Sequence, residues 1–232
     1  MSQILGRNQT GFGILIEQDA GGFVPERNQT LISEGKFEIS PDKPILIDCI
    51  LQKYDVENRN GRIYPEKILK KEVENYMNLI NTNSALNEVN HPNDSNINLN
   101  NIGHLIKKVW WEGNVLWGTL EIITSPAYMR DGICSLPGDG IAELLKRGVK
   151  LGISSRGVGS IKNVGGKNIV QDDFELICFD LVASPSTPGA YLMNDTIRNN
   201  ENNNKMNFAE HTESKKSSIN EKLNNLLDNF LL

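Results

Sequence analysis

The chain has 232 residues, 24 Lys and Arg against 29 Asp and Glu, and a formal charge of −5 at pH 7. This length holds one well-cored domain with tails, and a second full domain is not expected. The charge balance and the lack of a Lys/Arg stripe with interleaved aromatic residues argue against a direct nucleic-acid partner.

No apolar run approaches the roughly 18 residues needed to cross a bilayer, so we expect no membrane partner. The three cysteines have no CxxC spacing, and the three histidines show no HExxH pattern. A disulfide framework, a metal site and a cofactor are therefore not expected, and a reducing compartment fits best.

The first predicted elements are an arm, a strand and a helix. Residues 1–40 are rich in Gly, Asn, Gln and Glu, so they predict a weakly structured N-terminal arm. Residues 45–51 are a short run rich in β-branched side chains, which predicts a buried strand. Pro65 then begins a predicted helix, whose apolar residues recur at helical spacing up to Ile80.

The central region predicts a hairpin followed by a loop and a short helix. Residues 104–111 and 115–123 read as two strands joined through Gly113. Residues 125–138 read as loop, and Asp139 then caps a short helix that ends before residue 148.

A strand with alternating apolar residues follows and places Ser154 on the face opposite its apolar side chains. After Ser154 and Ser155 come Arg156, a fixed cation, and Gly157, a residue that permits close backbone approach. Nucleophilic acyl transfer needs a hydroxyl on a rigid element beside donors for a developing oxyanion. Serines beside glycines are more often turns, so this segment alone does not establish a nucleophile.

Two further polar side chains are set apart by their surroundings. His91 precedes a proline, which favours extended backbone there. Asp180 is the only charge between residues 176 and 183 of the last predicted strand, and a buried carboxylate needs an imidazole, an arginine or another donor. With Ser154, these residues supply a base, a nucleophile and an orienting carboxylate, although a structural role for Asp180 is an open alternative.

Short motifs occur in one order over about residues 45–190. They are Asn58-Arg59-Asn60 with Arg62 and Tyr64-Pro65, Asn90-His91-Pro92, Trp110 to Asn114, Ser154 to Gly157, and Asp180 with Pro185-Ser186. In these motifs the chain resembles the prohead core protein protease family of T-even-like tailed bacteriophages.

The resemblance implies an α+β fold, mainly an antiparallel β-barrel surrounded by helices and similar to the herpesvirus assembly protease. It implies that His91 and Ser154 are base and nucleophile and that Asp180 is the third member. His104 is the alternative third member, because herpesvirus relatives use a second histidine there. Arg156 and Gly157 match positions that support the oxyanion. Ser155 is a second candidate nucleophile, but the strand alternation turns it to the apolar side.

The resemblance also implies a function: a serine endopeptidase of prohead maturation that needs no cofactor. Its substrates would be phage scaffold, core and major capsid proteins, inside the assembling prohead in the host bacterial cytoplasm. The sequence leaves a homo-oligomer open. The alternatives are a catalytically inactive scaffold or core component, and a barrel that only binds peptides.

Self-cleavage is a further implication, because the family prefers sites similar to Leu/Ile-x-Glu. Glu17, Glu34 and Glu221 each end such a triplet in this chain. We expect a cut after Glu17 or Glu221 to free the enzyme from its arm or its terminal helix.

The expected domain organisation follows from these interpretations. Residues 1–40 form the arm and a candidate pro-segment, and residues 41–193 form the serine protease domain. Residues 194–214 form an Asn-rich linker, and residues 215–232 form an amphipathic docking helix that begins at a Ser/Glu capping box.

Overall fold

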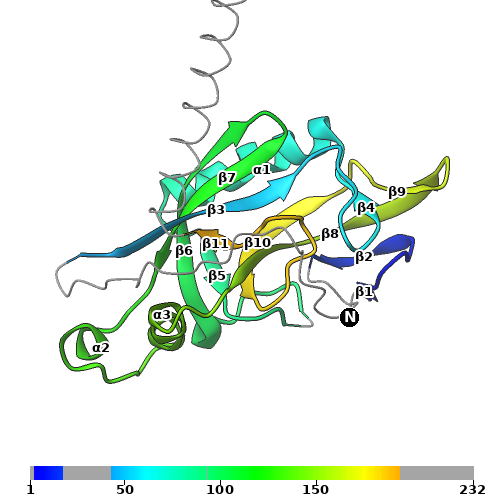
Figure 1. Ribbon diagram of the computed structural model, residues 1–232. Coiled ribbons are helices and arrows are strands. Elements are labelled where there is room, and N and C mark those ends of the chain that lie inside the picture. Colours follow the sequence, from blue (N-terminus) through cyan, green and yellow to red (C-terminus); the bar gives the residue numbers. More distant parts are fainter. Residues whose placement is uncertain (1–2, 18–42, 93, 194–232) are drawn as a thin grey trace, which may run out of the picture. The chain divides into compact units, whose positions relative to one another are not determined.

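The computed structural model describes residues 3–17, 43–92 and 94–193 (Figure 1). The chain divides into two compact units, Met1–Met193 and Asn194–Leu232. The expected linker and docking helix lie outside the described residues, as do Glu34 and Glu221.

A six-stranded sheet is built around one long strand, β8 (Gly152–Val164), which carries the serine motif. The order is β1-β2-β8-β9-β4, and β10 also pairs with β8. The other strands are β1 (Ile4–Leu5), β2 (Gly11–Ile16), β4 (Arg62–Ile63), β9 (Lys167–Val170) and β10 (Glu175–Val182).

A second sheet of five strands has the order β11-β3-β7-β6-β5. Its strands are β3 (Ile45–Lys53), β5 (Leu86–Glu88), β6 (Ile102–Glu112), β7 (Val115–Ile122) and β11 (Leu192–Met193). The β6–β7 hairpin turns at Gly113, which has a positive φ of 61°. The expected strand and hairpin in this region are thus present.

The expectation of a closed barrel is wrong for the described residues, which form two open sheets within a mixed α+β fold. Isolated bridges connect the sheets at Val89–Leu181 and Gly152–Tyr191. After Val89 the backbone turns at Asn90, whose φ is +68°, so the chain leaves the strand direction after a single bridge. The local turn therefore prevents a continuous ladder at this point.

Helix α1 (Glu66–Asn81) follows Pro65 as expected, and its buried side chains face the core. Tyr76 lies edge-on against Phe179 of β10, with ring centroids 5.3 Å apart, and Leu69 and Val73 are also buried. Each such apolar side chain contributes about 1.5 to 3 kcal/mol when it leaves water. This packing places α1 against the strand that carries Asp180.

The segment expected to be a loop contains helix α2 (Pro126–Asp131), which Ser125 caps by accepting from the amide of Tyr128. Helix α3 (Pro137–Lys146) begins three residues earlier than expected, because Leu136 and not Asp139 is its N-cap residue, and a short 3₁₀ helix, η1, spans Leu99–Asn101. The Ser125-Pro126 pair was a start signal for α2 in the sequence.

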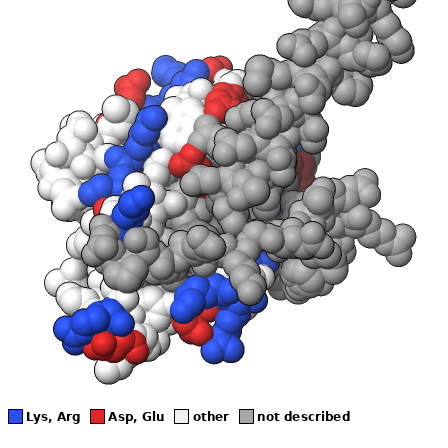
Figure 2. Space-filling view, turned by 60° about the vertical axis from the view of Figure 1, so that its left-hand side comes forward, with Lys and Arg blue, Asp and Glu red and all other residues white. Residues whose placement is uncertain are grey.

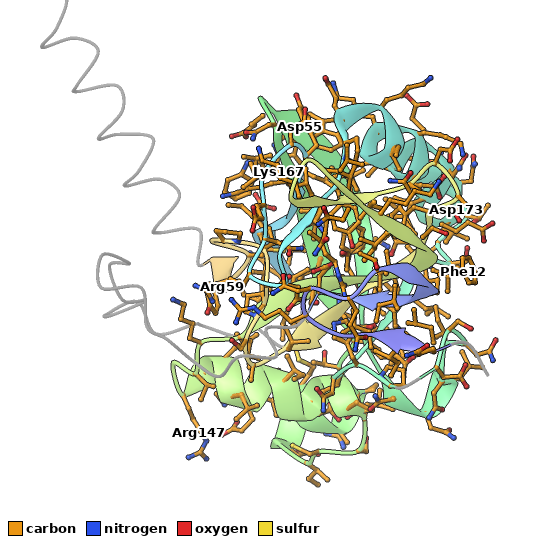
Figure 3. The ribbon with its side chains drawn as sticks, turned by 90° about the vertical axis from the view of Figure 1, so that its right-hand side faces the viewer. Phe12, Asp55, Arg59, Arg147, Lys167 and Asp173 are labelled. Atoms are coloured by element: carbon orange, nitrogen blue, oxygen red, sulfur yellow. The ribbon has the colours of Figure 1, made fainter. Side chains whose placement is uncertain are left out.

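The N-terminal region differs from the expected weak arm, because β1 and β2 belong to the sheet. Strand β2 runs antiparallel to β8, and it buries Ile14 and Leu15. Figure 3 labels Phe12, the second residue of this strand. Pairing with β8 supplies the order that this short, glycine-containing sequence does not predict.

In the part of the chain that the structure describes, no helix is long and apolar enough to cross a membrane. On the face shown in Figure 2, Lys and Arg side chains lie among acidic and uncharged ones.

Candidate active site

Ser154 and Asp180 lie directly opposite each other on the neighbouring antiparallel strands β8 and β10. Directly opposed residues share one face of a sheet and have closely spaced Cβ atoms. Both residues are buried, with exposed fractions of 1% and 0%. The sheet register therefore fixes a hydroxyl and a carboxylate on one face, close enough for one side chain to bridge them.

His91 bridges the two groups from the segment that follows β5. Its Nδ1 lies 2.7 Å from Asp180 Oδ2, and its Nε2 lies 2.7 Å from Ser154 Oγ. A carboxylate only accepts, so Nδ1 carries the donated proton and Nε2 is left to accept from the hydroxyl. The amide of Asn90 donates to the carbonyl of Leu181 at 2.8 Å, which ties the histidine segment to β10.

Asp180 accepts several hydrogen bonds besides that of His91. The amide of Glu88 lies 2.9 Å from Oδ1, Arg156 Nε lies 2.8 Å from Oδ2, and the Cys178 thiol lies 3.2 Å from Oδ1. Burial alone raises the pKa of Asp180, but the hydrogen bond and electrostatic interaction with His91 and the charge of Arg156 outweigh it and lower the pKa. The carboxylate is therefore ionised at neutral pH.

Arg156 is fully buried and forms ion pairs with the carboxylates of Asp180 and Glu88. Besides Asp180, its guanidinium binds Glu88 Oε1 at 2.7 Å and the carbonyls of Asp94 and Asn96 at 2.7 and 3.3 Å. These contacts direct it toward Asp180 and the loop after His91. Direct oxyanion support by this side chain remains a prediction.

Gly157 lies where a side chain would meet its neighbours. A Cβ there would be 2.4 Å from the Phe174 ring and 2.5 Å from the carbonyl oxygen of Glu175. Close packing thus explains the glycine, and its expected oxyanion role remains a prediction.

His104 lies on β6, fully buried, and its Nε2 is 2.9 Å from the carbonyl of Phe179. Burial lowers its pKa to about 4, although the nearby charge of Asp180 opposes the change. At neutral pH this histidine is uncharged. The structure thus places Asp180, and not His104, in hydrogen-bond contact with His91.

On the other face of β8, Ser155 contacts polar groups away from His91. Its Oγ accepts from Gln52 Nε2 at 2.9 Å, and Gln52 Oε1 accepts from Thr187 Oγ1 at 2.6 Å. Neighbouring residues of a strand point to opposite faces, as expected for Ser154 and Ser155.

Glu17, a candidate cleavage position, is fully buried at the end of β2. Its carboxylate accepts from five side chains: Asn58, Asn60, Arg62, Tyr64 and Ser186. The sequence motifs around residues 58–64 and 185–186 thus contribute side chains that contact this carboxylate and not His91, Ser154 or Asp180.

Sequence reasoning missed Glu88 and Gln52. Glu88 was detectable only as a carboxylate three residues before His91, whereas Gln52 carried no such signal at the end of a strand. In the described ranges, no three His, Cys, Asp or Glu side chains are grouped to hold a metal ion.

Three comparisons with known proteins agree. The family model of the prohead core protein serine protease matches residues 19–202. The prohead core protein protease of Enterobacteria phage T4 is 35% identical over 151 residues, which cover 64% of this chain and 68% of that protein. The solved structure of the bacteriophage T4 capsid assembly protease, gp21, matches with a TM-score of 0.57 and 28% identity, over 74% of this chain and 98% of that chain. The chain therefore belongs to the prohead core protein serine protease family, whose members are phage capsid maturation proteases.

Proposed function

We propose that the chain is a serine endopeptidase in which Ser154 is the nucleophile, His91 the general base and Asp180 the residue that orients the base. The observation that carries the proposal is the unbroken chain of hydrogen bonds from Asp180 through both ring nitrogens of His91 to Ser154, in which each donor–acceptor distance is 2.7 Å. Nucleophile, base and orienting group in this order are the requirement for activating a hydroxyl at neutral pH.

In the first step, Ser154 Oγ attacks the carbonyl carbon of the scissile bond while His91 Nε2 takes its proton. His91 then gives the proton to the leaving amine, and an acyl-enzyme ester remains on Ser154. Water attacks the ester with His91 again as base, which releases the carboxyl product. Asp180 stays ionised throughout and stabilises the imidazolium.

Arg156 and Glu88 support this chemistry by holding Asp180. Arg156 joins the two carboxylates, and its Nε donates to Oδ2 of Asp180, the same oxygen that accepts from His91 Nδ1, so this oxygen is held in place for the histidine. We retain Arg156 and Gly157 as candidates for oxyanion support. A donor there contributes about 10² to 10³ in kcat.

The substrates in this proposal are the scaffold, core and major capsid proteins of the phage, cut after Leu/Ile-x-Glu-like sites inside the assembling prohead. Family membership supports this assignment. It also favours a fold related to the herpesvirus assembly protease. Residues 41–193, together with strands β1 and β2, would form the protease domain, and residues 215–232 would dock it in the core.

The test compares the full chain with Ser154→Ala by intact mass over time. The parent should shorten, and the variant should keep its mass. If neither chain shortens and neither cuts a Leu-x-Glu peptide or isolated proheads, the inactive scaffold component becomes the better account.

A further inference from the structure

The Glu17 cluster consists of Glu17, Asn58, Asn60, Arg62, Tyr64 and Ser186, all buried. Oε1 of Glu17 accepts from Arg62 Nη1 at 2.9 Å and from the Tyr64 hydroxyl. Oε2 accepts from Asn58 at 2.6 Å, Asn60 at 3.1 Å and Ser186 at 2.7 Å. This buried carboxylate, which accepts from one cation and four neutral donors, is held in one position. Moving it would break hydrogen bonds and leave part of its negative charge without a partner.

The backbone of Glu17 connects this cluster to the nucleophile strand. Its amide donates to the carbonyl of Ser155 at 3.0 Å, and its carbonyl accepts from the amide of Ser186 at 2.7 Å. Ser155 directly follows Ser154. Glu17, at the end of β2, therefore holds the carbonyl of the residue next to the proposed nucleophile and connects it to the loop at Ser186.

A second set of hydrogen bonds holds Ser155 by its side chain. Gln52 connects the hydroxyl of Ser155 to that of Thr187, the neighbour of Ser186. Ser155 is thus held at its carbonyl by Glu17 and at its hydroxyl by Gln52. Neither tie takes part in the proton transfers at His91, so hydrolysis itself does not explain them.

We propose that Glu17 is a positioning residue of the active site and that the β1–β2 segment remains bound in the active enzyme, even when the chain beyond Glu17 is cut. This inference rests on the proposed function of Ser154. It replaces the expectation that a cut after Glu17 frees the enzyme from its whole arm. Such a cut would add a carboxylate at Glu17, whose oxygens still accept from Ser186, while the buried side chain keeps its five donors.

Glu17→Gln tests the positioning role, because it keeps the size of the side chain and removes its charge beside Arg62. Asp139→Asn is the matched control. Asp139 is also fully buried and accepts from the amides of Ser125, Ser135 and Leu136, but it lies in the first turn of α3. Both variants are measured for kcat, KM, melting temperature and the rate at which a fluorophosphonate labels Ser154.

Glu17→Gln should lower kcat and the labelling rate together by about tenfold or more, with KM within about twofold, because a small displacement of a reacting group is costly. Asp139→Asn should lower the melting temperature but leave kcat per folded molecule within about twofold. Equal effects of both variants on kcat would overturn the positioning role. If Glu17→Gln does not fold, Ser186→Ala removes one donor, and a labelling rate equal to the parent's would also overturn it.

Strand retention is tested independently of catalysis. A recognition sequence for a site-specific protease is inserted between residues 18 and 42 of the full Ser154→Ala chain, which is cut and passed through gel filtration. The fragment with residues 1–17 should co-elute with the rest, and Glu17→Gln should release it. Release from the chain with Glu17 intact would overturn the inference. A folded parent that is neither active nor labelled would instead overturn the proposed function.

Discussion

Replacing Asp180 with Asn tests the orientation of His91 most sharply, because it exchanges one acceptor oxygen for an NH₂ group of equal size. Asp180 Oδ2 faces His91 Nδ1 and Arg156 Nε, and Oδ1 faces the amide of Glu88 and the thiol of Cys178. Every one of these neighbours presents a donor. In either orientation, the amide NH₂ therefore points at a donor.

The expected losses of kcat and of stability follow from this geometry. With NH₂ toward His91, Nδ1 must become the acceptor, so Nε2 carries the proton and no longer accepts from Ser154. This wrong tautomer lowers kcat by about 10⁴, or roughly 5.5 kcal/mol of transition-state stabilisation. The stability loss should lie near the lower end of about 3 to 5 kcal/mol for breaking a buried ion pair, because Arg156 keeps its contact with Glu88.

The assay is hydrolysis of a Leu-x-Glu peptide by Asp180→Asn, with circular dichroism to establish the folded fraction. His104→Gln serves as the comparison, and it should keep kcat per folded molecule within about threefold, because His104 binds the Phe179 carbonyl and not His91. A kcat of Asp180→Asn within tenfold of the parent, or a greater loss in His104→Gln, would refute the assignment of Asp180.

Three further predictions concern stability, oxyanion support and recruitment. The pKa of His104 is about 4 in the folded chain, against 6.5 for an ordinary histidine, so the unfolded chain binds more protons between these two pH values. The free energy of unfolding should therefore fall by about 3 kcal/mol as the pH drops from 6.5 to 4. Urea titrations should show this fall in the parent and not in His104→Gln. Gly157→Ala brings Cβ against Phe174 and should lower stability by about 1 to 3 kcal/mol or more, as seen in its melting temperature; an unchanged melting temperature with lower kcat would favour the oxyanion role instead. Deletion of residues 208–232 should spare peptide hydrolysis but impair incorporation into the assembling core, and normal co-assembly of the shortened chain would refute the docking role.

The elements that the sequence predicts well are those with strong local patterns. Helix α1 has a proline at its start and an apolar face, and the β6–β7 hairpin has a glycine turn between two apolar runs. The hydrogen-bonded group of His91, Ser154 and Asp180 draws on residues that are conspicuous in the sequence: a histidine before proline, a serine beside glycines and a lone carboxylate in an apolar strand. Their catalytic roles remain a prediction.

What the sequence did not predict depends on contacts between distant segments. Strand β2 is short and rich in glycine, and its order comes from pairing with residues of β8 that lie 140 to 150 positions later, and from the donors around Glu17. The role of Arg156 depends in the same way on Glu88 and Asp180, which only the fold brings to it. The prediction of a closed barrel was wrong because closure needs a continuous hydrogen-bond ladder between the two sheets. The positive φ at Asn90 turns the chain away after the single bridge from Val89 to Leu181.

The most direct test of the central claim is to locate the reactive hydroxyl in the purified full chain with a fluorophosphonate probe and peptide mass spectrometry. Ser154 should carry the label, and His91→Ala should lower the labelling rate by at least about 10³. Labelling at Ser155, or peptide cleavage by a chain that is not labelled at Ser154, would contradict the account.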